Sequence, residues 1–408
     1  LLDERRGGRH RGLLGLAVAG LIGLSVSLPV LGLVVLKMLP FDNKSEFQVV
    51  VDMPAGTPVE KTAAVLRELS AHLATVPEVT DYQAYAGTAA PINFNGLVRQ
   101  YYLRSGGEVG DIQVNLVDKS QRKDQSHAIA VRERAALRAI GQRHGANVKV
   151  VEVPPGPPVL APIVAEIYGP DADGRRAVVR QVRAVFEATP GVVDVDDTTI
   201  VDAPRTVLVV DRRKAAQLGV SQQAIASTLR MGLSGDAATY LHDASRFAVA
   251  AYIQLPAELH GSLDALLQLG VRSASGALVP IRELVTVSDS LREQPIFHKD
   301  LLPVSFVMGD MAGQKAGELD SPLYGMFQMR GPLAQLKMPD GGQLDEYLIH
   351  QPQDPYRSYA LKWDGEWQIT YETFRDMGAA YAVGLILIYL LVVAHFGSYL
   401  TPLIIMAP

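Results

Sequence analysis

Two long apolar stretches divide the chain into a middle region and two flanks. Residues 12–36 and residues 377–396 contain no Asp, Glu, Lys or Arg. Because about 20 apolar residues cross a bilayer as a helix, each stretch predicts a transmembrane helix. A third apolar run at 400–408 predicts the start of a further membrane helix that the end of the chain cuts short. We also expect the start at Leu1 to be a truncation.

The flank before the first apolar stretch sets the predicted orientation. Arg5, Arg6, Arg9 and Arg11 precede it, and basic residues favour the cytoplasmic side of a membrane. We therefore predict a cytoplasmic flank at 1–11 and an extracytoplasmic middle region. A secretory signal peptide is the competing interpretation, but its apolar core spans only about 7–15 residues.

One face of the first predicted helix carries small residues at every fourth position. Gly15, Ala19, Gly23 and Ser27 form this series, and small residues let neighbouring membrane helices approach closely. We therefore predict that this face packs against another helix. Chance recurrence in a glycine-rich segment is the alternative.

The middle region alternates between strand and helix patterns. Phe47–Met53 alternates in polarity and is rich in valine, which predicts a strand. Thr57 is the expected N-cap of the next helix, with Pro58 at its first position. This β-α-β pattern recurs three times, which predicts two ferredoxin-like subdomains in tandem. The predicted order is a first subdomain at 37–160, a second at 161–204 and 300–370, and a small α+β unit at 205–299 inserted into the second.

Two shorter segments complete this interpretation. Pro154–Pro158 contains four prolines in five residues, and fixed proline φ angles predict a stiff linker between the subdomains. Ser321–Met329 has a strand-like pattern, and we expect it to complete the interrupted second subdomain. The fold class is therefore a membrane protein, with transmembrane α-helices and a large α+β region of β-α-β repeats.

Composition excludes several classes of function. The 408 residues carry a formal net charge of -5, which argues against nucleic-acid binding. The chain has no cysteine, so disulfides, zinc-thiolate sites and thiol nucleophiles are excluded. The mean hydropathy of +0.12 fits a few membrane spans attached to a large water-exposed region.

The search for catalytic chemistry is negative. The sequence contains no nucleophile elbow, zinc-binding H-E-x-x-H, P-loop or dinucleotide-binding motif. We therefore predict no catalytic residue, metal site or cofactor. The acidic residues Asp194, Asp196, Asp197 and Asp202 alternate along a predicted strand, and we expect them to face water rather than bind a cation. Trp363 and Trp367 precede the second span, which fits either the membrane interface or ordinary core packing.

Several motifs occur in an order that resembles a known family. They include the segments FQVVVDMPAGTP at 47–58, LGVS at 218–221, KMPD at 337–340, WDGE at 363–366 and AHFGSYLTPLIIMAP at 394–408. In this order over the whole chain, they resemble the resistance-nodulation-division (RND) efflux transporters, at the start of the C-terminal half of the inner-membrane permease. In that family a periplasmic porter region has two β-α-β subdomains, with a docking subdomain inserted in the second.

The resemblance implies a transporter rather than an enzyme. It implies a homotrimer in the bacterial inner membrane with a large periplasmic loop, a periplasmic adaptor and an outer-membrane channel. It also implies proton-driven export of small amphiphilic compounds, and contact with membrane lipids. Substrate would pass a Gly-rich loop at Gly87–Gly96, where Ile92, Asn93 and Phe94 are the candidates for contact; the alternative is a structural loop with a buried Phe94. Gly235, Tyr240, Asp243 and Arg246 match the docking hairpin.

One departure from the family pattern limits these expectations. The family couples proton flow to export through intramembrane aspartates and a lysine, whereas both predicted spans lack Asp, Glu and Lys. We therefore predict that residues 1–408 alone transport nothing. The alternatives are a lipid exporter or translocation accessory of the same superfamily, and a membrane-anchored periplasmic sensor or scaffold.

Overall fold

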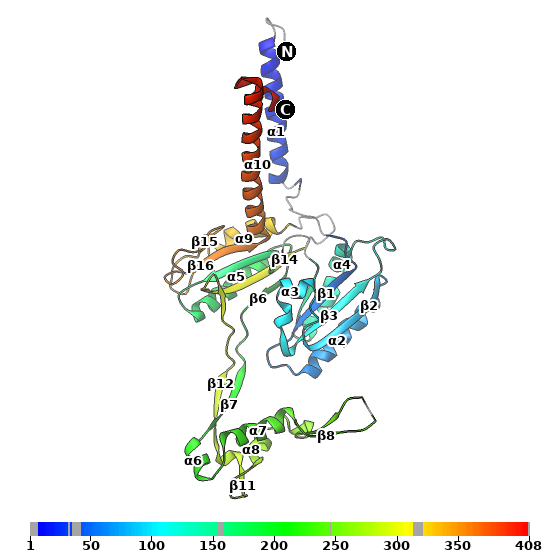
Figure 1. Cartoon of the computed structure of the whole chain (residues 1–408), viewed down its shortest axis with the longest axis vertical. Coiled ribbons are helices and arrows are strands. Elements are labelled where there is room, and N and C mark those ends of the chain that lie inside the picture. Colours follow the sequence, from blue (N-terminus) through cyan, green and yellow to red (C-terminus); the bar gives the residue numbers. More distant parts are fainter. Residues whose placement is uncertain are drawn as a thin grey trace. The chain divides into compact units, whose positions relative to one another are not determined.

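A computed structural model describes residues 7–31, 33–34, 42–153, 158–244, 246–312 and 321–406. These residues form two compact units (Figure 1). The first unit contains 1–201 and 294–408, and the second contains 202–293. The predicted proline linker lies largely outside the described residues.

The first subdomain is an antiparallel sheet with two helices on one face (Figure 1). The strand order is β2-β3-β1-β4. Alternation places Phe47, Val49 and Val51 in the core beneath the helices. The elements are β1 (Glu46–Asp52), α2 (Val59–Leu73), β2 (Val79–Thr88), α3 (Phe94–Val98), a 3-10 turn (Tyr101–Leu103), β3 (Ser105–Leu116), α4 (Ser126–Arg143) and β4 (Asn147–Val151).

The predicted N-cap of the first helix in this subdomain is wrong. Pro58 occupies the N-cap position of α2. The Thr57 hydroxyl instead donates a hydrogen bond to the Pro54 carbonyl at 2.6 Å. Thr57 therefore closes the preceding turn, and the helix begins one residue later than the capping pattern predicted.

The second subdomain has the sheet order β13-β14-β5-β16-β15, and β6 also pairs with β14. Helices α5 and α9 contribute buried side chains to its core. The predicted strand at Ser321–Met329 is wrong, because residues 322–333 form α9. The elements are β5 (Ile163–Tyr168), α5 (Ala172–Ala188), β6 (Val192–Asp197), β13 (Phe297–Lys299), β14 (Leu302–Met311), α9 (Pro322–Leu333), β15 (Asp345–Tyr347) and β16 (Ala360–Gly365).

The last strand of this sheet continues directly into a long helix, α10 (Glu366–Phe396). Trp363 is fully buried in the subdomain core, whereas Trp367 stacks edge-on against Phe327 of α9. Both tryptophans therefore belong to the packing of this junction. Gly365 makes the turn with φ +78°, a conformation that favours glycine.

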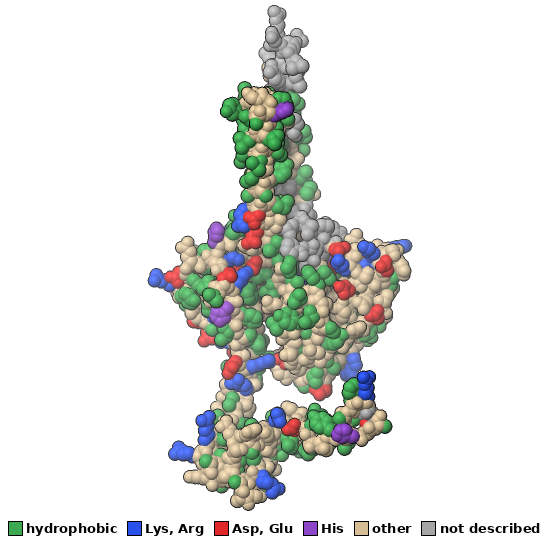
Figure 2. All heavy atoms as spheres, viewed as in Figure 1, with side chains coloured by type: hydrophobic (Ala, Val, Ile, Leu, Met, Phe, Trp, Pro, Cys, Tyr) green, Lys and Arg blue, Asp and Glu red, His purple; other side chains and the backbone are tan. Residues whose placement is uncertain are grey.

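Apolar side chains gather along the visible face of α10, and charged side chains appear at its end next to the second sheet (Figure 2). Among the described residues, α10 is the one helix long and apolar enough to cross a membrane; its 31 residues span about 46 Å. The first predicted span overlaps α1 (Gly7–Val30), whose apolar part at Gly12–Leu28 is shorter. The end of that span lies outside the described residues. A short helix, α11 (Leu400–Met406), follows α10.

The second unit is a small α+β body with a core of its own. Strands β7 and β12 form an antiparallel ribbon, and β8 and β9 form a hairpin. Ser221 caps α7, accepting a hydrogen bond from the Ala224 amide at 3.1 Å. The elements are β7 (Pro204–Val210), α6 (Arg212–Gln217), α7 (Gln222–Ser234), β8 (Asp236–Leu241), β9 (Val249–Ile253), a 3-10 turn (Ala257–Leu259), α8 (Leu263–Gln268), β10 (Gly270–Arg272), β11 (Leu278–Pro280), a 3-10 turn (Ile281–Glu283) and β12 (Val285–Leu291).

Candidate functional site

The predicted substrate-contact residues lie in the segment between β2 and α3. Asn93 caps α3, since its side-chain oxygen accepts a hydrogen bond from the Gly96 amide at 2.6 Å. Its flanking residues are open to solvent, with Ile92 70% and Phe94 47% exposed. The structure therefore gives Asn93 a role in the fold and leaves two apolar side chains at the surface.

These residues adjoin a polar surface of the first sheet. On the side of the sheet away from the helices, Asp81, Asn115 and Glu46 form one cross-strand row, and Gln83 and Gln113 belong to the next. We call these five residues the polar face. The Asn115 amide donates to Asp81 at 2.6 Å, and the Gln113 amide donates to Glu46 at 2.9 Å.

Asn93 connects the loop to this polar face. Its side-chain amide donates a hydrogen bond to the Gln113 carbonyl oxygen at 2.9 Å. Ile92 and Phe94 therefore flank a residue that is fixed to the sheet, and Asn93 connects them to Gln113, whose amide donates to the Glu46 carboxylate. This combination suits a ligand with both apolar and polar parts.

Residues 89–104 are held to the sheet by a buried carboxylate, Asp111. One Asp111 oxygen accepts from the Ala90 amide at 2.8 Å, and the other pairs with Arg104 at 2.9 Å. Arg104 also pairs with Asp52 and donates to the Val51 carbonyl. Burial raises the pKa of Asp111, against the opposing effect of Arg104. We call 89–104 the loop segment.

Lys149 extends this arrangement to the second subdomain. Its ammonium group binds Asp52 of β1 at 2.7 Å and also pairs with Asp196 of β6. Only 3% of the Lys149 side chain is exposed. Burial by itself would lower the pKa of Lys149, but Asp196 and Asp52 outweigh it and hold the pKa above its ordinary value.

The prediction that the acidic residues face water is wrong for Asp194 and Asp197, whose side chains are 7% and 6% exposed, whereas Asp202 is exposed as predicted. Asp194 is buried and contacts Arg134 at 3.1 Å and Arg138 at 3.3 Å. Asp197 pairs with Arg183 of its own subdomain at 2.5 Å. The carboxylates of β6 therefore meet cations, Asp194 those of the first subdomain and Asp197 one from α5. Burial raises the pKa of Asp194 more than the two arginines lower it.

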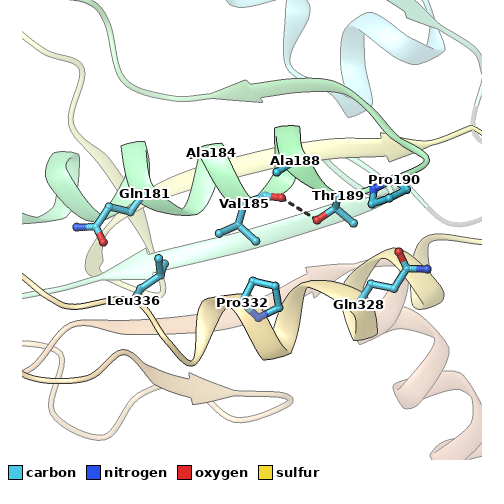
Figure 3. Close-up of a pocket in the computed structure, with 9 residues that line it drawn as sticks. All are labelled: Gln181, Ala184, Val185, Ala188, Thr189, Pro190, Gln328, Pro332 and Leu336. Carbon is cyan, nitrogen blue, oxygen red and sulfur yellow. Dashed lines mark hydrogen bonds between the residues drawn. The ribbon is translucent and has the colours of Figure 1, made fainter.

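A groove of about 450 Å³ lies between α5 and α9 (Figure 3). Its walls carry no charged residue. Pro332 has no backbone N–H, so the Gln328 carbonyl lacks its usual partner within α9. No sequence signal marks this groove. It is lined by Gln181, Ala184, Val185, Ala188, Thr189, Pro190, Gln328, Pro332 and Leu336.

The predicted docking hairpin is formed by β8 and β9. Gly235 ends α7 with φ +75° and starts the hairpin, and Tyr240 is exposed on β8. Asp243 and Arg246 lie in the connection, where the Arg246 guanidinium lies 5.6 Å from the ring centre of Phe247. The hairpin thus presents aromatic and charged side chains to solvent, and its docking role stays a prediction.

The small-residue face of α1 has no partner among the described residues. A Cβ atom added at Gly15 or Gly23 would meet no atom within 4 Å, and the Ser27 hydroxyl bonds to the Leu24 carbonyl at 2.7 Å. Packing through Gly15, Ala19, Gly23 and Ser27 therefore stays a prediction.

Metal-binding chemistry is not apparent in the described part of the chain. There, no group of three or more His, Asp or Glu side chains lies close enough to hold a metal ion. Sequence reasoning missed Arg104 and Lys149, which organise the site. For Lys149 a signal existed, since it interrupts the apolar strand NVKVV at 147–151.

The fold defines a class of membrane-attached proteins with two tandem β-α-β subdomains, an inserted α+β unit and a helix that continues from the second sheet. A model of the AcrB/AcrD/AcrF family matches residues 8–408. The chain belongs to this family of RND permeases.

Curated relatives match parts of the chain. The cobalt-zinc-cadmium resistance protein CzcA of Cupriavidus metallidurans is 20% identical over 246 residues, which cover 59% of this chain and 21% of that protein. The nickel and cobalt resistance protein CnrA of the same organism is 30% identical over 133 residues, which cover 31% of this chain and 12% of that protein. The matched regions are therefore about a fifth or less of these relatives.

The fold also matches a solved structure. A crystal structure of a heavy metal efflux pump superimposes with a TM-score of 0.67 and 17% identity, covering 96% of this chain and 38% of that chain. A second crystal form gives a TM-score of 0.66. At this identity the likeness shows that the two chains share a fold.

Proposed function

We propose that this chain is the central porter region of an RND efflux permease, and that substrate passes over the polar face of the first sheet beside Ile92 and Phe94. The observation that carries the proposal is the exposure of these two apolar side chains next to Asn93, which is bound to Gln113. Family membership supports transport rather than catalysis.

The full-length permease would act as a proton-driven secondary transporter of the bacterial inner membrane. Its chain would cross the membrane several times, with the large loop in the periplasm, as the arginines before the first span indicate. We propose a homotrimer that works with a periplasmic adaptor and an outer-membrane channel. The hairpin bearing Gly235, Tyr240, Asp243 and Arg246 would take part in docking between these components.

Small amphiphilic compounds are the substrate class that the local geometry favours. Ile92 and Phe94 offer apolar contact without a fixed hydrogen-bond pattern, and the polar face offers carboxylate and amide groups. A compound with an apolar body and a polar or cationic group would contact both surfaces.

Divalent metal cations are the second candidate, because the relatives named above are metal resistance proteins. Asp81 and Glu46 of the polar face would supply oxygen ligands. However, they lie two strand spacings apart in one row, about 10 Å at the backbone. One ion would therefore contact both carboxylates only if their side chains lean together.

The first prediction separates the two substrate classes. The full-length permease is expressed in a host without its own RND pumps, and resistance is measured to cationic amphiphiles and to zinc, cobalt, nickel and cadmium salts. Phe94→Ala is expected to lower resistance to the amphiphiles, because loss of the aromatic contact weakens their binding about tenfold, equivalent to about 1.4 kcal/mol. Tyr356→Ala is the matched control, because Tyr356 is an aromatic residue that is 59% exposed between β15 and β16 of the second subdomain.

The metal candidate predicts a different pattern. Metal resistance would then fall in Asp81→Asn and Glu46→Gln and stay unchanged in Phe94→Ala. If wild-type permease confers resistance to neither class, or if Phe94→Ala and all polar-face variants retain full resistance, this placement of the substrate path is wrong.

A further inference from the structure

Charges of opposite sign form the contact between the two subdomains. In the ion pairs that join their described residues, the first subdomain supplies the cations and the second supplies the carboxylates. Such a polar contact separates more readily than an apolar one. The cations are Arg99, Arg134, Arg138 and Lys149, and the carboxylates are Asp194, Asp196 and Asp310.

Lys149 differs from the other cations because it also binds a carboxylate of its own subdomain. Its ammonium group pairs with Asp196 across the contact and with Asp52 at 2.7 Å within the first sheet. The ring of Tyr101, in the loop segment, lies 5.9 Å from the same ammonium group. Lys149 therefore contacts both the second subdomain, through Asp196, and the loop segment, through the ring of Tyr101.

Asp52 in turn pairs with both Lys149 and Arg104, and Arg104 is the side chain that contacts the carboxylate holding the loop segment. Arg104 pairs with Asp52 and, at 2.9 Å, with Asp111. Asp111 accepts a hydrogen bond from the Ala90 amide at 2.8 Å. A continuous path of contacts therefore leads from the second subdomain to the loop segment, in the order Asp196, Lys149, Asp52, Arg104, Asp111 and Ala90.

We propose that Lys149 is a positioning residue that couples the subdomain contact to the placement of the loop segment. When Asp196 moves away, Lys149 keeps Asp52 as its carboxylate partner and draws it from Arg104. Arg104 is then less firmly fixed, and so is Asp111, whose other oxygen accepts the hydrogen bond from the Ala90 amide. The consequence for export rests on the proposed function, because the loop segment carries Ile92 and Phe94.

Hydrogen exchange of the loop segment in the full-length permease tests this coupling. Asp196→Asn is expected to speed exchange across 89–104 by at least about fivefold, the lower end of typical couplings between sites. Asp197→Asn is the matched control, because Asp197 is the next residue of β6 and pairs with Arg183 of its own subdomain at 2.5 Å. It should leave 89–104 unchanged.

Variants at Lys149 separate positioning from a general structural effect. Lys149→Met should speed hydrogen exchange of 89–104, whereas Lys149→Arg, which keeps the positive charge, should exchange as slowly as wild type. In the Lys149→Met background, Asp196→Asn should cause no further increase in the exchange rate. Unchanged exchange in Asp196→Asn, an equal response in Asp197→Asn or additive effects in the double variant would overturn the proposal. If Lys149→Met does not fold, the two aspartate variants decide.

Export measured on the same variants keeps the two proposals distinct. Faster exchange in Asp196→Asn together with altered export supports both. Faster exchange with wild-type export supports the coupling and contradicts the placement of the substrate path at the loop segment. Wild-type exchange overturns the coupling whatever export does.

Discussion

At the scale of single residues, charged side chains within strands form the ion pairs that hold the candidate site together. Asp52 ends the valine-rich strand β1, and Lys149 lies within β4. Their positions in strands were predictable from alternation, whereas their partners were not, because Asp196 lies 47 residues away from Lys149 along the chain. Pairing at this separation depends on how the two sheets meet, which local sequence patterns do not encode.

Asp52 gives the pH-dependent prediction at this scale. Burial alone would raise the pKa of Asp52, but Lys149 and Arg104 outweigh it and hold the pKa well below 3.8. The ionised carboxylate therefore stabilises the folded state above about pH 3.8, and this contribution is lost as the pH falls towards the folded pKa. Asp52→Asn should lower the free energy of unfolding by about 1–3 kcal/mol at pH 7.

Thermal unfolding of the full-length permease between pH 3 and pH 8 measures this effect. The difference between wild type and Asp52→Asn should narrow as the pH falls below about 4. Asp173→Asn, at a largely exposed carboxylate, should match wild type throughout. A difference that persists unchanged into acid would show that the charge of Asp52 does not stabilise the fold.

At the scale of elements, the apolar pattern predicted the helices better than their ends. The predicted span at 377–396 lies within α10, but α10 begins at Glu366, where it continues from β16. The misassigned α9 has buried Pro322, Gly325, Met326, Met329 and Leu333. That series has helical spacing, and its Gly and Pro residues hid it behind an apparent strand pattern.

At the junction between β16 and α10, we expect that only glycine is tolerated at position 365. A Cβ atom at Gly365 would lie 2.6 Å from the carbonyl oxygens of Ala161 and Pro162, and φ is +78°. Gly365→Ala should therefore destabilise the permease by about 1–3 kcal/mol. The control is Gly378→Ala, within α10, where an added Cβ meets no atom within 4 Å. Equal melting temperatures for the two variants would contradict this account of the junction.

At the scale of the whole molecule, the order of segments was the most predictable property. The β-α-β repeats and the motifs around Phe47–Pro58 and Ala394–Pro408 indicated an RND permease from the sequence, and the family match over 8–408 confirms it. The contact between subdomains was not predictable, because it pairs charged residues that lie far apart along the chain, as Lys149 and Asp196 do, and local sequence patterns do not identify such partners. The substrate stays a proposal, since the matched regions are small parts of the relatives.

Transport by reconstituted protein tests the central claim most directly. Proteoliposomes containing the full-length permease receive a proton gradient, and movement of a fluorescent cationic amphiphile is compared with vesicles containing residues 1–408 alone. We predict gradient-dependent transport by the full-length permease and none by residues 1–408, whose predicted spans carry no Asp, Glu or Lys. Full-length vesicles that transport neither the amphiphile nor divalent metal cations, or equal transport by residues 1–408 alone, would contradict the account.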